Sequence, residues 1–441
     1  MKTPIYDFLK QYDKENPVRL HMPGSKGKIN IPFGFDITEI DGADFLFSPS
    51  GIIKESEINA SILFNTGATL YSTEGSSLCI KTMIALLKKA GVTRILAARN
   101  AHVSFLNACI LSDMEVTWIY PDGKLTSICS GDYTAKTIDK ALKKTRIKAV
   151  YVTSPDYLGN ILDIKAMSEV CKKHGAYLIV DNAHGAYLKF LAPDLHPISQ
   201  GADMCCDSAH KTLPVMTGGA YLHINKNTNE TFIKNAKSVM SVFATTSPSY
   251  MIMASLDFAN KIINDEIRRF NETALMVERL KSELLSLGFI NISREPFKIA
   301  IDAVNSNINA YELYRFLREK NVVSEYYDEA VLVMMFSALN GEDDYIKTLS
   351  AFKEAVGRIG PNCFEETKLI ISEKVQRLNM RDAFFADSED ISIDLAKGRI
   401  CSQTKTVCPP CIPIICTGEV FDENAIKILK RYGILNVSVV K

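Results

Sequence analysis

The chain has 441 residues, of which 47% are hydrophobic and 23% are charged. This composition is typical of a folded globular protein and excludes intrinsic disorder. Lys plus Arg and Asp plus Glu both number 51, so the net charge gives no general attraction to nucleic acid or to anionic membranes. No apolar run is long enough to span a bilayer. A chain of this length exceeds one ordinary hydrophobic core, which predicts two or three domains.

The first residues, Met1 to Asp7, contain no apolar core of a signal peptide, and we therefore expect a cytoplasmic protein. The chain contains 11 Cys residues, which are scattered and odd in number. In a long chain without a signal peptide, this pattern favours reduced thiols, mostly in the core, over a disulfide scaffold.

Residues 1–54 are expected to form an N-terminal arm, because polar residues, Gly and Pro interrupt any periodic pattern there. From residue 55 onward, strand-like and helix-like segments alternate and are separated by short loops. The expected strands are 94–98, 115–120, 149–153 and 176–181, and the expected helices are 76–90, 103–111 and 164–174. Repeated strand–helix units predict an α/β large domain over residues 55–250, with a mainly parallel sheet covered by helices on both faces.

A second, smaller α+β domain is expected over residues 251–441. Residues 248–287 have a helical pattern with few breakers, and such a helix can lead the chain from one domain into the next. The elements expected after it are strands at 299–302 and 330–336, and helices at 311–320, 344–358, 375–383 and 424–431.

Cys408 and Cys411 have the spacing of a redox or metal pair, with two Pro residues between them. A redox motif of this type accompanies a βαβ pattern, which the sequence does not show at this point. The sequence also contains no second Cys-x-x-Cys that would complete a metal site. We therefore interpret the two residues as thiols in a Pro-rich loop.

The segment 176–181 is apolar and ends in Asp181, which predicts a buried strand with a carboxylate at its carboxyl end. Lys211 follows in a segment flanked by Met204 and Leu213, so its surroundings are not those of a solvated surface lysine. This layout is typical of an enzyme that binds pyridoxal 5′-phosphate. The Lys forms a Schiff base with the aldehyde, and the Asp keeps the pyridine nitrogen protonated so that the ring accepts electrons.

A carboxylate at the end of a buried strand needs a partner, because its desolvation is costly. The alternatives to a pyridinium are a structural salt bridge and a Mg²⁺ ion. His184 lies three residues after Asp181, but this pair lacks a third convincing ligand nearby. We therefore expect no metal site here.

Gly75, Ser76 and Ser77 stand at the start of an expected helix. The backbone N–H groups, the hydroxyls and the helix dipole at such a position favour a bound phosphate. A plain N-cap would give the same pattern, and the phosphate interpretation depends on the Asp and Lys described above.

Three further polar side chains are expected near the same ligand. His102 follows the expected strand 94–98, and a residue at the carboxyl end of a parallel strand faces the ligand crevice of this fold. Its imidazole is expected to stack on a flat cofactor ring, and a helix-terminal histidine without a ligand is the alternative. Ser208 and His210 alternate with Lys211, so they can bind phosphate while the Lys meets the aldehyde.

Together these motifs resemble the ornithine/lysine/arginine decarboxylase family of fold-type-I pyridoxal-phosphate enzymes, whose large domain is like that of aspartate aminotransferase. The most specific match is the lysine signature at 208–217, and the segment 99–104 resembles the one that supplies the ring-stacking histidine. The resemblance covers nearly the whole chain, with further matching blocks at 21–24, 36–42, 51–55, 245–250, 398–400, 409–410, 412–413 and 418–419.

By this resemblance Lys211 is the Schiff-base lysine, Asp181 pairs with the pyridine nitrogen and His102 stacks on the ring. The other residues that the resemblance places around the cofactor are Gly75, Ser76, Ser77, Ala183, His184, Ser208 and His210. Thr246 lies in the loop that reaches the phosphate of the partner subunit, which implies a homodimer with shared active sites. Glu325 matches the acidic residue that meets the distal cationic group of the substrate.

The chain departs from the family pattern at several positions. Ser25 stands where a second His is usual, Lys28 where a Gly is usual, and Asn182 where an acid is common. Cys408 and Cys411 stand where Tyr and Gly are usual. None of these departures removes a cofactor-binding residue. The chain also lacks the long N-terminal wing domain of the large inducible members, so it resembles the short form, and decameric assembly is not implied.

The resemblance implies a cytoplasmic, pyridoxal-phosphate-dependent enzyme that decarboxylates L-arginine, L-lysine or L-ornithine to an amine of polyamine metabolism. One Glu at the distal end of the substrate suits all three. The expected partners are the amino acid and a second copy of the chain, without nucleic acid or membrane. The alternatives are another fold-type-I reaction, such as that of an aminotransferase or an aldolase, and a non-catalytic cofactor-binding paralogue.

Overall fold

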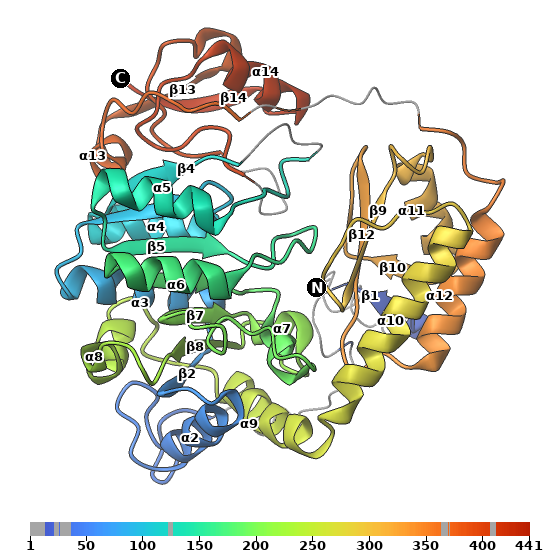
Figure 1. Ribbon diagram of the computed structural model, residues 1–441, viewed down its shortest axis with the longest axis horizontal. Helices are drawn as coiled ribbons and strands as arrows, with labels where there is room; N and C mark the ends of the chain where they lie inside the picture. Colours follow the sequence, from blue (N-terminus) through green and yellow to red (C-terminus); the bar gives the residue numbers. More distant parts are fainter. Residues whose placement is uncertain are drawn as a thin grey trace, which may run out of the picture.

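Figure 1 shows a computed structural model of the chain, which describes residues 14–21, 26, 37–121, 127–362, 369, 371–405 and 412–441. The structural statements below concern these residues. Ser25, Lys28, Cys408 and Cys411 lie outside them. None of the helices in the described part of the chain combines the length and the apolar character that crossing a membrane requires.

A 7-stranded sheet in the order β2-β8-β7-β6-β5-β3-β4 is the centre of the fold. Its strands are β2 (Ala68–Ser72), β3 (Arg94–Ala98), β4 (Glu115–Ile119), β5 (Ala149–Thr153), β6 (Tyr177–Asp181), β7 (Met204–Asp207) and β8 (Ala220–Ile224). Only β8 is antiparallel to its neighbours β2 and β7, and the remaining pairs are parallel. The predicted α/β architecture with a mainly parallel sheet is confirmed.

Helices cover both faces of this sheet because its strands are apolar on both sides, as buried parallel strands are. Side chains alternate between the faces: Ile95 and Ala97 point to one, and Leu96 and Ala98 point to the other. The first face packs against α3 (Gly75–Lys89), α4 (Val103–Ser112) and α8 (Glu230–Ser241). The second packs against α5 (Ala135–Thr145) and α6 (Ile164–His174).

Local capping fixes where these helices begin and end. Asp163 accepts a hydrogen bond from the Ala166 N–H at the start of α6, and Gly175 ends that helix in the left-handed conformation. The α2 helix (Ile52–Phe64) precedes β2, and α7 (Ala209–Thr212) is a single short turn after β7. A 3-10 helix, η2 (Ala186–Phe190), follows β6.

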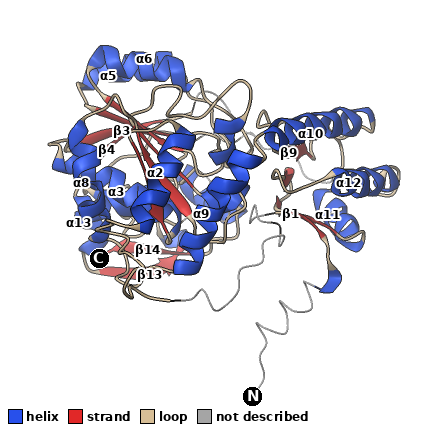
Figure 2. Cartoon of the chain, turned by 90° about the horizontal axis from the view of Figure 1, so that it is seen from below, coloured by secondary structure: helices blue, strands red, loops and turns tan. Residues whose placement is uncertain are grey.

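The predicted helix over residues 248–287 is wrong in one respect, because it consists of two helices, α9 (Tyr250–Asp265) and α10 (Arg268–Ser286). The break falls at Glu266 and Ile267, directly after Asn264 and Asp265 at the end of α9. Asn and Asp have low helix propensity, which favours an end to the helix at this point. The break allows α9 to pack on α2 while α10 leads away from the large sheet (Figure 2).

A 3-stranded antiparallel sheet follows α10, in the order β11-β12-β9. Its strands are β9 (Lys298–Asp302), β11 (Tyr326–Tyr327) and β12 (Val331–Met335). The helices α11 (Ala310–Glu319) and α12 (Glu342–Ala355) accompany it, at the right of Figure 1. The short strand β1 (Val18–Leu20) of the N-terminal segment pairs in parallel with β10 (Val322–Ser324).

The last part of the chain lies beside β4, at the top of Figure 1. It contains α13 (Met380–Phe385), the antiparallel pair β13 (Ser388–Ser392) and β14 (Asn436–Val440), the 3-10 helix η3 (Ile393–Leu395) and α14 (Glu423–Arg431). The helix expected at 375–383 begins only at Met380, because Gln376 instead forms a β-bridge with Glu419. The domain boundaries expected at 54/55 and 250/251 stay a prediction.

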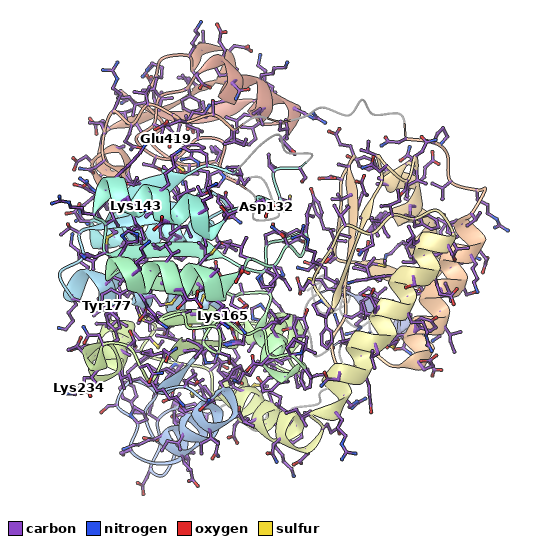
Figure 3. The ribbon with its side chains drawn as sticks, viewed as in Figure 1. Asp132, Lys143, Lys165, Tyr177, Lys234 and Glu419 are labelled. Atoms are coloured by element: carbon purple, nitrogen blue, oxygen red, sulfur yellow. The ribbon has the colours of Figure 1, made fainter. Side chains whose placement is uncertain are left out.

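An ion pair buried from solvent joins this C-terminal part to the sheet. Arg99, the residue after β3, donates from its Nη1 and Nη2 atoms to the two carboxylate oxygens of Glu419, at 2.5 and 2.6 Å. The exposed fractions of the two side chains are 0% and 1%. Figure 3 labels Glu419 in the C-terminal part, next to the helices of the large sheet. Because neither charge can reach water, each depends on the other.

Removing the charge of Glu419 is therefore expected to destabilise the protein. Glu419→Gln leaves the Arg99 guanidinium buried without a counter-ion, which typically costs about 3–5 kcal/mol. The matched control is Glu115→Gln, which breaks the exposed pair with Arg94 at the other end of β3 and is worth less than about 1 kcal/mol. Denaturant unfolding measures both changes, and equal losses in the two variants would contradict this role of the buried pair.

Candidate active site

One cleft lies at the carboxyl ends of β3, β5 and β6. Parallel strands end at the same edge of their sheet, and ligands bind there in folds of this class. The sequence-predicted residues that line the cleft are Ser76, His102, Asp181, Ala183, His184 and Lys211. Residues predicted from separate motifs are thus close together in space.

Asp181 ends β6 and is buried at the floor of the cleft. Its carboxylate accepts hydrogen bonds from the Tyr151 hydroxyl at 3.0 Å and from the Ala183 N–H at 3.2 Å. The Cys206 thiol contacts the same carboxylate at 3.6 Å. These partners hold the carboxylate in one orientation and leave it at the wall of the cleft, where a cationic N–H can meet it.

Lys211 extends from the short helix α7 into the same cleft. Its Nζ lies 3.0 Å from the His184 Nε2. Burial lowers the pKa of Lys211, and the positive charge of Lys298 lowers it further, against the opposing effect of Asp181. A lowered pKa favours the neutral amine, which is the form that attacks an aldehyde.

His102 is the N-cap of α4. Its Nδ1 accepts the Ser104 N–H at 3.1 Å and lies 2.9 Å from the Ser104 hydroxyl. This contact fixes the ring and puts its proton on Nε2. Burial lowers the pKa of His102, so the ring is neutral and suited to stacking on a flat ligand.

The residues expected to bind phosphate meet at the start of α3. Ser208 donates to the Ser76 hydroxyl at 2.8 Å, and Ser77 shares a hydrogen bond with Ser104 at 2.7 Å. His210 is turned toward the Gly219 carbonyl, 3.0 Å from its Nδ1, and burial lowers the pKa of His210 to about 4. Of these side chains, only Ser76 is part of the cleft lining itself.

The cleft fits pyridoxal 5′-phosphate by the chemistry of its donors and acceptors. The helix α3 begins at Gly75 without a side-chain cap. The Gly75 N–H donates to the Gly218 carbonyl, so the N–H groups of Ser76 and Ser77 are the ones that an anion can meet. Gly75 has a φ of +69°, and a Cβ added there would meet no atom within 4 Å, which leaves open space for a ligand. The Asn100 amide in the cleft has no hydrogen-bond partner for its N or O atom among the described residues.

Glu325 lies between β10 and β11 and accepts a hydrogen bond from the Tyr157 hydroxyl at 3.2 Å. Glu325 does not line the cleft, but its partner Tyr157 does. The negative charge of Glu325 acts to raise the pKa of Lys211, against the lowering effect of burial. Thr246 is exposed and lies outside the cleft lining of its own chain. The adjacent Thr245 N–H donates to Glu74, the residue before α3.

Asn182, at a departure from the family pattern, is part of a buried network behind the cleft. Its amide donates to Asp207 at 2.6 Å, and His196 and His223 both contact the other oxygen of Asp207 through Nε2 at 3.0 Å. Burial alone would raise the pKa of Asp207, but the two imidazoles hold it below its usual range. These separations are those of hydrogen bonds between a carboxylate and two ring N–H groups.

The sequence analysis missed several residues of the cleft. Thr153 ends β5, and Pro155, Asp156 and Tyr157 follow it. The rule that identified His102 after β3 would have identified them too. The others are Asn100, Cys129 and Ile412. Ile412 comes from the C-terminal part of the chain and has no local signal of a role at the cleft.

A sequence model of the family described as "Orn/Lys/Arg decarboxylase, major domain" matches residues 3–295 of the chain. The arginine decarboxylase of Bacillus subtilis (strain 168) is 28% identical over 458 residues, which cover 96% of this chain and 92% of that protein. The inducible lysine decarboxylase of Escherichia coli (strain K12) is 26% identical over 278 residues, which cover 54% of this chain and 36% of that protein.

Solved structures show the same fold. Lysine decarboxylase A from Pseudomonas aeruginosa matches with a TM-score of 0.74 and 15% identity, over 96% of this chain and 81% of that chain. The constitutive lysine decarboxylase of E. coli matches with a TM-score of 0.73 and 16% identity, over 92% of this chain and 75% of that chain. These structures confirm the predicted fold-type-I class. Because the family model matches more than half of the residues of this chain, the chain belongs to the Orn/Lys/Arg decarboxylase family and is an amino-acid decarboxylase.

Proposed function

We propose that this protein uses pyridoxal 5′-phosphate to decarboxylate a basic L-amino acid, namely arginine, lysine or ornithine. The observation that carries the proposal is the pairing of Lys211 and Asp181 across one cleft, with Lys211 biased toward its neutral form. The similarity to arginine and lysine decarboxylases supports the same reaction.

We propose the following cofactor contacts. The first turn of α3, with Gly75, Ser76 and Ser77, and the residues Ser208 and His210 would hold the phosphate. Asp181 would hold the pyridine N–H, and His102 and Ala183 would contact the two faces of the ring. When bound, the cofactor supplies an aldehyde for Lys211 and an electron-accepting ring that stabilises negative charge at the substrate Cα after CO₂ departs.

The residues of the chain then have three tasks. Asp181 would keep the bound ring nitrogen protonated, because a carboxylate raises the pKa of an N–H partner. Lys211 or the adjacent His184, whose Nε2 lies 3.0 Å from the Lys211 Nζ, would deliver a proton to the substrate Cα after decarboxylation. The apolar wall that Ile412 and Pro155 contribute excludes water, which strengthens each of these electrostatic contacts.

We assign Glu325 to the distal ammonium or guanidinium group of the substrate. Its carboxylate is held by the Tyr157 hydroxyl, whose ring contacts His184 edge-on at a centroid distance of 5.5 Å. These contacts connect Glu325, at the proposed substrate end of the cleft, to His184 beside Lys211. A charged partner for a cationic side chain adds about 1.5–3 kcal/mol to binding.

We further propose a cytoplasmic homodimer that acts in polyamine metabolism and in which Thr246 serves the cofactor phosphate of the partner subunit. Thr246 is exposed on its own chain, as this role requires. Ile58 and Ile62 on α2 and Phe258 on the adjacent α9 are exposed apolar residues, and burial in a subunit interface would stabilise them.

Lys211→Ala is expected to abolish the reaction, with a loss of about three orders of magnitude or more in kcat. The measurement is the amine formed from L-arginine, L-lysine and L-ornithine, together with the covalent retention of pyridoxal phosphate after borohydride reduction. Lys165→Ala, at an exposed lysine on α6 (Figure 3), is the control and should retain both. An oxo acid product from the wild-type protein would favour an aminotransferase, and no product with retained cofactor would favour a non-catalytic paralogue.

Glu325→Gln is expected to lower kcat/KM for the preferred basic amino acid by about 10- to 100-fold, because it removes a charge without changing shape. The loss should appear mainly in KM and should be much smaller for a neutral analogue, such as citrulline for arginine. Glu329→Gln is the control, since Glu329 pairs with Arg431 instead. Equal losses for the charged and the neutral substrate would remove Glu325 from the substrate site.

A further inference from the structure

A second lysine lies directly behind the cleft. Lys298 begins β9 and is buried, with a side-chain exposure of 0%. Its Nζ lies 2.6 Å from the Glu295 carboxylate, 3.3 Å from the Asp156 carbonyl oxygen and 3.4 Å from the His184 Nδ1. The contact with Glu295 is an ion pair, and the Asp156 carbonyl oxygen and the His184 Nδ1 are hydrogen-bond acceptors for the ammonium. Lys298 is therefore accommodated as a cation despite its burial.

This cation determines which nitrogen of His184 carries the ring proton. An ammonium donates hydrogen bonds and accepts none, so the Nδ1 atom that faces Lys298 must be the acceptor. Burial and the neighbouring positive charges lower the pKa of His184 far below its usual range, which keeps the ring neutral. A neutral ring that accepts at Nδ1 carries its proton on Nε2.

The Nε2 of His184 faces the Nζ of Lys211 at 3.0 Å. If Nε2 carries the proton, the nitrogen of Lys211 must accept it, and only an unprotonated amine has a lone pair for that purpose. The positive charge of Lys298 thus acts on Lys211 through the orientation of one imidazole as well as directly through space.

We propose that Lys298, held by Glu295, is a positioning residue of the active site: it fixes His184 with its Nε2–H toward Lys211 and so keeps the Lys211 amine unprotonated. This role deepens the proposed function, on which it rests, because an unprotonated Lys211 is what condensation with pyridoxal phosphate needs. The negative groups that act against it on Lys211 are Asp181 and Glu325. Burial raises the pKa of the nearby Cys206 thiol well above its usual range, so this group is neutral. The groups that face His184 are Lys211, Lys298, His102 and His210.

The test measures the protonation of Lys211 without its cofactor. The full-length protein is stripped of pyridoxal phosphate, labelled with trace acetic anhydride across a pH series, and the acetylation of Lys211 is quantified by mass spectrometry. In Lys298→Met the midpoint of Lys211 labelling should move to higher pH, so that labelling near neutral pH falls about tenfold for each pKa unit gained. Lys298→Arg, which retains the cation, should restore most of the labelling.

Two controls separate this role from a general structural one. Lys281→Met removes another buried lysine, whose Nζ bonds to the Glu295 backbone carbonyl at 2.9 Å, and should leave the labelling midpoint unchanged. In a His184→Phe background, Lys298→Met should shift the midpoint pH of Lys211 labelling by less than half of the shift that it causes when His184 is present. An unchanged midpoint in Lys298→Met, or an effect of full size without His184, would overturn the proposal.

A measurement on the unmodified protein covers the case in which Lys298→Met does not fold. The chain has 7 histidines, and ¹⁵N labelling of histidine with a His184→Gln variant for assignment reports the tautomer of His184. The Nε2–H form is expected, and the Nδ1–H form would overturn the proposal. Because neither readout involves decarboxylation, these results stand apart from the outcome of the amine assay, and failure of one does not imply failure of the other.

Discussion

The cost of holding positive charge away from water is the constraint on which the active site depends. Burial lowers the pKa of Lys211, His102, His184 and His210, so four nitrogen bases around one cleft favour their neutral forms. The neutral forms are useful because each has a lone pair. A group that stays charged in such a place needs its own counter-ion, and Lys298 has Glu295.

The parallel sheet is what brings these groups to one place. His102, Asp156 and Asp181 come from the carboxyl ends of β3, β5 and β6, which are neighbours in the sheet although their segments are well separated in the sequence. Asp181 is the last residue of β6, whereas His102 and Asp156 lie a few residues after the ends of β3 and β5. The strands are packed on both faces, so their ends give these short segments fixed starting points.

The sequence predicts this part of the molecule well because its signals are local. Strands such as 94–98 and 149–153 are apolar runs between loops, and the structure has them with the same bounds. The break between α9 and α10 was not predicted, since no Gly or Pro marks it. Lys298 was not identified either: its neighbours indicate only a strand, and its partners Glu295, Asp156 and His184 become visible only in the folded chain. The same holds for the contact of Ile412 with the cleft and for the ion pair of Glu419 with Arg99, both of which come from the far end of the sequence.

The contact between Arg99 and Glu419 has a consequence for the order in which the protein is made. The two residues are 320 positions apart, so Arg99 leaves the ribosome long before its counter-ion exists. Until residue 419 is synthesised, the charge after β3 has no buried partner, and the wall of the cleft that includes Ile412 is missing. A nascent chain can thus form most of its sheet while it still lacks a closed cleft.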